Sequence, residues 1–242
     1  MSGHSKWSTI KHRKGAQDVK RGKLFSKLVK EIVVSAKLGG GDIAANPRLR
    51  TAVMKAKAAS MPAKNIDNAI KKATGSREGA GYHEVTYEGY GPEGVAILVE
   101  CLTDNKKRTV SDIRAIFSKN GGSLGQSGSV AWQFEKKGVI LIAKAIIEEE
   151  ALIEKVLAYG GEDVLVEVEG YTVISDPGEF SNLLEKLRAA AIEIESAEIT
   201  MVPKNFTTIA DDKHEKILKL TERLDDLDDV QTVSSNEKVT PA

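Results

Sequence analysis

The sequence has little of what stabilises secreted proteins or anchors a chain in a membrane. It contains one cysteine, Cys101, so no disulfide can form within the chain, which favours a reducing compartment. No run of residues approaches the roughly 20 apolar positions of a membrane-spanning helix, and the first residues lack the apolar stretch of a signal peptide. We therefore expect a cytoplasmic protein without membrane contact. Cys101 lies in an apolar run and is expected to be a buried structural thiol.

Motifs for catalysis and cofactor binding are also missing. The glycine-rich stretch 121–128 lacks the Lys-Ser/Thr pair of a Walker motif, and it follows a predicted helix instead of a strand. None of the four histidines forms a metal-ligand spacing with another histidine or with the cysteine. No nucleophile elbow is present. The sequence therefore predicts no catalytic residues, no metal, no cofactor and no small-molecule substrate, which describes a protein that is not an enzyme.

Charge is divided unevenly along the chain, although the formal net charge is zero. Residues 1–72 contain 17 Lys and Arg against 4 Asp and Glu, whereas the remaining residues contain 18 basic and 31 acidic side chains. A basic block of this density suits a polyanionic partner, and the acidic remainder would repel that partner. The N-terminal third is therefore the predicted binding region.

Hydrophobic periodicity predicts a small helical domain that follows a basic arm. Residues 1–20 have no apolar stripe and are expected to form an arm that orders on a partner. From Lys20 to Lys37 apolar residues recur at helical spacing with lysines on the opposite side, and three glycines then end the helix. Two further helices are expected at about 46–60 and 63–73.

After residue 82 the pattern changes to one of mixed strands and helices. A first block has strands at 85–90, 95–102 and 130–134 and a helix at 109–119. Residues 138–202 then show the order β-α-β-β-α-β of a ferredoxin-like unit. A last helix, about 210–227, and a strand near 230–233 are too small to form a domain alone. We infer that they return to complete the first block.

The predicted fold class is therefore α+β with three domains, an N-terminal helical domain and two α+β domains, at least one of them ferredoxin-like. Residues 1–78 would form the basic arm and helical domain. Residues 79–137 together with 203–242 would form a discontinuous α+β domain. Residues 138–202 would form the inserted ferredoxin-like domain.

Cationic side chains of the arm and helices are the candidate nucleic-acid contacts. Lysine and arginine neutralise phosphates, and the indole of Trp7 can stack on an unpaired base. The alternative is a solvated tail in which Trp7 packs on the first helix. A helix-turn-helix is not favoured, because the third helix offers few base-reading side chains beyond Lys64, Asn65, Asn68, Lys71 and Lys72. The candidates are Lys6, Trp7, Lys11, His12, Arg13, Lys14, Lys20, Arg21, Lys23, Lys27, Lys30, Arg48, Arg50, Lys55 and Lys57.

The end of the last long helix is acidic. Carboxylates at a helix C-terminus oppose the helix dipole, and this end carries Asp225, Asp226, Asp228 and Asp229. A solvated acidic end is the favoured interpretation. The alternative is a contact with a partner surface, such as the basic domain of the same chain.

Several ordered motifs resemble the YebC/PmpR family. They are Gly3–Trp7, Ile10–Lys14, Leu38–Asp42, Asn46–Arg50, Tyr87–Pro92, Glu100–Asn105 and Phe117–Gly122. The resemblance implies three domains around a cleft and a cytoplasmic protein described as a probable transcriptional regulator, with promoter DNA as the partner of some members. Related mitochondrial proteins activate translation of cytochrome oxidase, and bacterial relatives have been linked to ribosomes stalled on proline-rich stretches.

We therefore predict a nucleic-acid-binding regulator of transcription with DNA as its target. Two alternatives stay open. The phosphates of DNA and RNA look alike to lysine, so the charge pattern does not separate these two targets. One is a ribosome-associated translation factor that binds ribosomal or messenger RNA. The other is a protein-interaction scaffold whose basic arm binds acidic protein.

Overall fold

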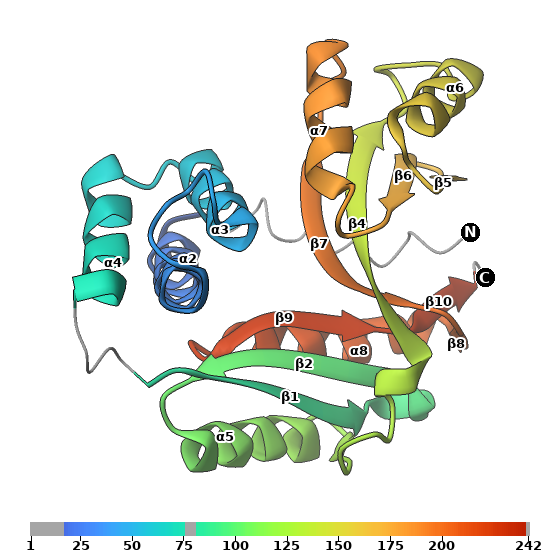
Figure 1. Cartoon of the computed structure of the whole chain (residues 1–242). Coiled ribbons are helices and arrows are strands. Elements are labelled where there is room, and N and C mark those ends of the chain that lie inside the picture. Colours follow the sequence, from blue (N-terminus) through green and yellow to red (C-terminus); the bar gives the residue numbers. More distant parts are fainter. Residues whose placement is uncertain (1–16, 76–80, 241–242) are drawn as a thin grey trace.

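The structure, a computed structural model, describes residues 17–75 and 81–240. The predicted α+β fold class is confirmed: a helical domain lies beside two sheet-containing domains, which are stacked one above the other in Figure 1. Within the described ranges, no helix is long and apolar enough to cross a bilayer.

Three helices form the described part of the N-terminal domain around an aliphatic core. They are α2 (Gln17–Gly39), α3 (Pro47–Ala58) and α4 (Ala63–Gly75). Asn46 fixes the connection between α2 and α3. Its side-chain oxygen accepts a hydrogen bond from the N–H of Leu49, which caps α3, and its amide nitrogen donates to the carbonyls of Ser35 and Gly40. In Figure 1 α4 lies at the left edge of the molecule, far from the two sheets.

The middle domain is a sheet built from two separate stretches of chain. Its elements are β1 (His83–Tyr90), β2 (Ala96–Thr103), α5 (Lys106–Lys119), β3 (Ser123–Leu124), α8 (Asp211–Asp225) and β9 (Val230–Ser235). The strand order is β3-β1-β2-β9, so the C-terminal stretch supplies the strand beside β2. Phe117 of α5 and Ile217 of α8 are buried in one cluster with Ile97 of β2. Both helices therefore cover the same face of the sheet.

Cys101 lies on this covered face. It is 3% exposed, and burial raises the pKa of its thiol to about 12. The thiol is therefore the buried structural group that the sequence predicts, held protonated near neutral pH.

The third domain has the ferredoxin-like arrangement. Its elements are β4 (Phe134–Ala143), α6 (Glu149–Tyr159), β5 (Asp163–Val166), β6 (Gly170–Ser175), α7 (Phe180–Ala189) and β7 (Ser196–Pro203). The order is β5-β6-β4-β7, every neighbouring pair is antiparallel, and both helices pack on one face. β4 and β7 run without a break past residues 138 and 202 and descend into the middle domain (Figure 1). The two sheets are thus joined through a paired ribbon of strands.

The strand predicted at 130–134 is wrong for all but its last residue. The chain turns there in a short 3-10 helix before β4 begins. The carboxylate of Glu88 accepts hydrogen bonds from the backbone N–H groups of Gly128, Val130 and Ala131. Three N–H groups that converge on one carboxylate cannot point into a strand ladder. Burial alone would raise the pKa of Glu88, but these hydrogen bonds outweigh it and lower the pKa.

A small parallel pair of strands was not predicted. β8 (Thr207–Ala210) pairs with β10 (Glu237–Thr240). Asn236, 2% exposed, joins this pair to the middle sheet. Its side-chain oxygen accepts a hydrogen bond from the N–H of Ala96, and its amide nitrogen donates one to the side-chain oxygen of Gln133.

Candidate nucleic-acid interface

Part of the predicted interface precedes the residues that the structure covers. Lys20 and Arg21 lie in the first turns of α2, but their side chains are not described. Six predicted contacts fall outside the described residues altogether: Lys6, Trp7, Lys11, His12, Arg13 and Lys14.

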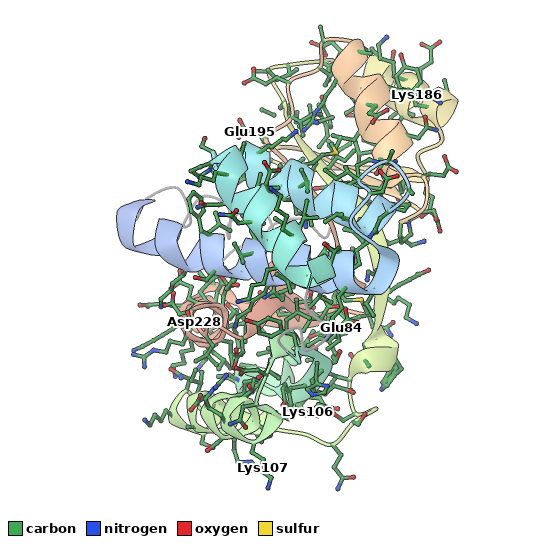
Figure 2. All side chains as sticks on the ribbon, turned by 60° about the vertical axis from the view of Figure 1, so that its left-hand side comes forward. Glu84, Lys106, Lys107, Lys186, Glu195 and Asp228 are labelled. Carbon is green, nitrogen blue, oxygen red and sulfur yellow. The ribbon has the colours of Figure 1, made fainter. Side chains whose placement is uncertain are left out.

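Lys23, Lys27 and Lys30, which we call the α2 lysine face, lie against the C-terminal end of α8 and the residues that follow it, 226–229. In Figure 2 Asp228 is directly beneath α2, between the helical and middle domains. The favoured interpretation of a solvated acidic end is therefore wrong, and the alternative of a contact with the basic domain holds. The contacts join Lys23 Nζ to the Asp226 carbonyl (3.0 Å), Lys27 Nζ to Asp225 Oδ1 (3.1 Å), and Lys30 Nζ to the Asp228 carbonyl (2.9 Å) and Asp229 Oδ1 (2.8 Å).

The lysines bind here because two sources of negative charge coincide, the C-terminal end of a helix dipole and the aspartate side chains. The last carbonyls of a helix have no partner within the helix and carry its negative dipole end, and here aspartate side chains add full charges. Water alone would solvate this end at a surface. Between two domains the ammonium groups of α2 supply both the donors and the opposite charge.

Asp229 is the most buried group of this contact. It is 8% exposed, and its Oδ1 accepts from Lys30 while its Oδ2 accepts from Arg108 (2.6 Å), Thr109 (2.8 Å) and Thr103 (3.2 Å). Burial alone would raise the pKa of this carboxyl, but the hydrogen bonds from Arg108, Lys30 and Thr109 outweigh it and lower the pKa to about 2. Asp229 therefore stays ionised and ties α2 to the middle domain.

Two predicted arginines also have partners within the chain. Arg48 Nε lies 2.8 Å from Glu31 Oε1, and its terminal nitrogen contacts Glu84 at the edge of the middle domain (Figure 2). Arg50 donates to backbone carbonyls in the loop between α2 and α3. Both guanidinium groups hold the helical domain in shape or in place, so they are less suited to phosphate binding than the sequence predicts.

The remaining lysines of the domain are placed differently. Lys57 is exposed, and Lys55 is half-buried on the same helix. Lys64, Lys71 and Lys72, which we call the α4 lysine face, are all exposed, while Ile66, Ala69 and Ala73 of the same helix are buried. In the sequence analysis these three lysines are weighed only for contacts to DNA bases, and they are not among the candidate nucleic-acid contacts. Their spacing on one polar side of α4 was the signal that could have included them.

Metal binding finds no support in the described part of the chain. Within residues 17–75 and 81–240, no group of three His, Cys, Asp or Glu side chains is arranged to hold an ion.

A basic helical domain, followed by an α+β domain that is interrupted by a ferredoxin-like insertion, defines a class of three-domain α+β protein. Sequence comparison places the chain within that class. The chain belongs to the TACO1/YebC family: residues 5–76 match the model described as the TACO1/YebC protein N-terminal domain, and residues 82–237 match the TACO1/YebC second and third domain.

Similar proteins are known from several bacteria. A probable transcriptional regulatory protein of Desulforapulum autotrophicum is 54% identical over 239 residues, 99% of this chain and 97% of the relative. One from Geobacter sulfurreducens is 54% identical over 236 residues, 98% and 95% of the two chains. The crystal structure of a conserved hypothetical protein from Aquifex aeolicus has a TM-score of 0.83 at 44% identity and covers 93% of each chain.

Proposed function

We propose that this chain is a cytoplasmic regulator of transcription that binds DNA through its N-terminal arm and the outer side of its helical domain. The observation that carries the proposal is the α4 lysine face. Its three lysines are exposed, and α4 itself lies at the edge of the helical domain, away from the two acidic sheet domains (Figure 1). The relatives' names, probable transcriptional regulatory proteins, support the same conclusion.

The chemistry of this surface suits the sugar-phosphate backbone. Lysine ammonium groups neutralise phosphates without reading bases, so they supply affinity and orientation more than sequence specificity. Asn65 and Asn68 are exposed between the lysines of α4 and add uncharged donors. The acidic middle and third domains would be repelled by the same phosphates, so they would face away from the DNA. We propose binding, not catalysis, as the whole activity of this surface.

The test is a salt titration of binding to a duplex DNA fragment and to a single-stranded RNA. Each phosphate contact contributes a slope of about −0.9 to log affinity against log salt on duplex DNA, and about −0.7 on a single strand. Replacing Lys11, Arg13 and Lys14 by alanine should therefore flatten the slope by roughly 2–3 units and weaken binding. Trp7→Ala should cost about 1–3 kcal/mol mainly on single strands, with little change in slope, if the indole stacks on bases.

Three outcomes decide the proposal. Binding of duplex DNA with the flattened slope supports it. Tight binding of RNA with weak binding of DNA would transfer the function to translation. An unchanged slope and affinity in the triple variant would remove the arm from the binding surface.

A further inference from the structure

The α2 lysine face is a row of cations with one spacing. Lys23, Lys27 and Lys30 are four and three residues apart, so they lie on one side of α2 and span about 10 Å along its axis. Each ammonium group contacts at least one oxygen of residues 225–229, at and just after the C-terminal end of α8. The row therefore binds a line of acceptor oxygens with negative charge.

The chemistry of that line is close to that of a phosphodiester chain. A nucleic-acid backbone also offers only acceptor oxygens at regular intervals, each carrying negative charge. The end of α8 offers the main-chain carbonyls of Asp225 and the C-cap Asp226 together with aspartate carboxylates. Both ligands would satisfy the same three ammonium groups, and they cannot do so at the same time.

The strength of the internal contact changes along the row. The side chains of Lys23 and Asp226 are 41% and 56% exposed, so this pair contributes little in water. Those of Lys30 and Asp229 are 14% and 10% exposed, and Asp229 has three further donors. A competitor would therefore displace α8 first at the Lys23 end, while Asp229 stays fixed to the middle domain.

We propose that the α2 lysine face is a second phosphate-binding surface, which the C-terminal end of α8 occupies as an internal substitute for a nucleic-acid backbone. This inference rests on the proposed function. Nucleic acid that reaches α2 releases the aspartates, and the helical domain separates there from the middle domain. Only molecules in which the internal contact is open can bind nucleic acid at α2. The apparent affinity for nucleic acid is therefore the intrinsic affinity multiplied by the fraction of open molecules.

The experiment weakens the internal ligand and leaves the lysines in place. The variant carries Asp225→Asn, Asp226→Asn and Asp228→Asn, which keep the main-chain carbonyls and the buried Leu220 and Leu224 that hold α8. A matched control removes three exposed carboxylates from the third domain, through Glu150→Gln, Glu154→Gln and Glu185→Gln. Both proteins lose the same charge. Binding is measured to a duplex DNA fragment and to a single-stranded RNA at one fixed salt concentration.

The aspartate variant should bind at least one of the two ligands about tenfold more tightly than the wild type, and the control should differ from the wild type by about twofold or less. Adding Lys23→Ala and Lys27→Ala to the aspartate variant should remove the gain. Equal affinities of the aspartate variant and the control would overturn the inference and leave the proposed function standing. If no protein binds either ligand, the proposed function fails and takes the inference with it.

Discussion

The two lysine faces of the helical domain look alike in sequence and differ in the folded protein. Each has three lysines on one side of a helix, over eight residues in α2 (23–30) and nine in α4 (64–72). The α2 lysine face meets the acidic end of α8, about 200 residues further along the chain, whereas the α4 lysine face is exposed. A basic helix face is therefore equally compatible with a joint between domains and with a ligand surface. Which one it is depends on what the rest of the chain brings to it.

The largest difference between the faces should be seen in stability. Asp229→Ala leaves Lys30 and Arg108 without their shared carboxylate and removes one acceptor of the Thr109 hydroxyl, so we expect a loss of about 3 kcal/mol. Urea denaturation at neutral pH measures it. Asp104→Ala is the matched control, because Asp104 also pairs with Arg108 but is exposed, and it should cost less than about 0.5 kcal/mol. Equal losses for both variants would contradict the assignment of Asp229 as the tie.

Acid should weaken the contact between the α2 lysine face and the middle domain, because this contact depends on the ionised carboxylate of Asp229. The pKa of Asp229 is lowered in the folded protein to about 2. Its contribution to the free energy of unfolding is therefore complete above about pH 4 and is lost as the pH falls through 2. We expect a loss of about 2 kcal/mol from this group. Asp229→Asn should lack this part of the acid dependence, and the same dependence in wild type and variant would rule out Asp229 as its source.

The third comparison concerns binding. Replacing Lys64, Lys71 and Lys72 by alanine should weaken binding to duplex DNA about tenfold, or about 1.4 kcal/mol, without changing thermal stability, because the side chains are exposed. The control replaces three exposed lysines of α5 in the middle domain, Lys119 together with Lys106 and Lys107, which Figure 2 labels. It should leave affinity nearly unchanged. A control that weakens binding as strongly would show that total charge, not the α4 lysine face, determines affinity.

The smallest effect should be found within the α2 lysine face itself. Lys23→Ala should change the free energy of unfolding by about 0.5 kcal/mol or less, because its ion pair is exposed. Lys30→Ala should cost more, because it leaves buried Asp229 with one fewer donor. Chemical denaturation of both variants tests this gradient, and the reverse order would argue against displacement of α8 from the Lys23 end.

The helices could be predicted because their signals are local. The apolar spacing in α2 and the cap Asn46 lie within a few residues of the structure that they determine. The partner of Lys30 could not be predicted in the same way, because nothing near it in sequence indicates Asp229. The error at 130–134 has a similar cause. An apolar stretch suggested a strand, but the carboxylate of Glu88, some 40 residues earlier, determines the turn.

The position of β9 at the far end of the chain has a consequence for synthesis on the ribosome. All strands of the ferredoxin-like domain have been synthesised once the chain reaches residue 203. The synthesis of β2 ends at residue 103, but that of its neighbour β9 begins only at residue 230. At ~5–20 residues per second that delay is roughly 6–25 s. During this time an inner strand of the finished sheet is an open edge, ready to pair with another chain. A nascent chain that stops before β9 therefore leaves β2, an inner strand of the finished sheet, unpaired along one side. This open edge is accessible to other chains, with which it can aggregate, and to proteases.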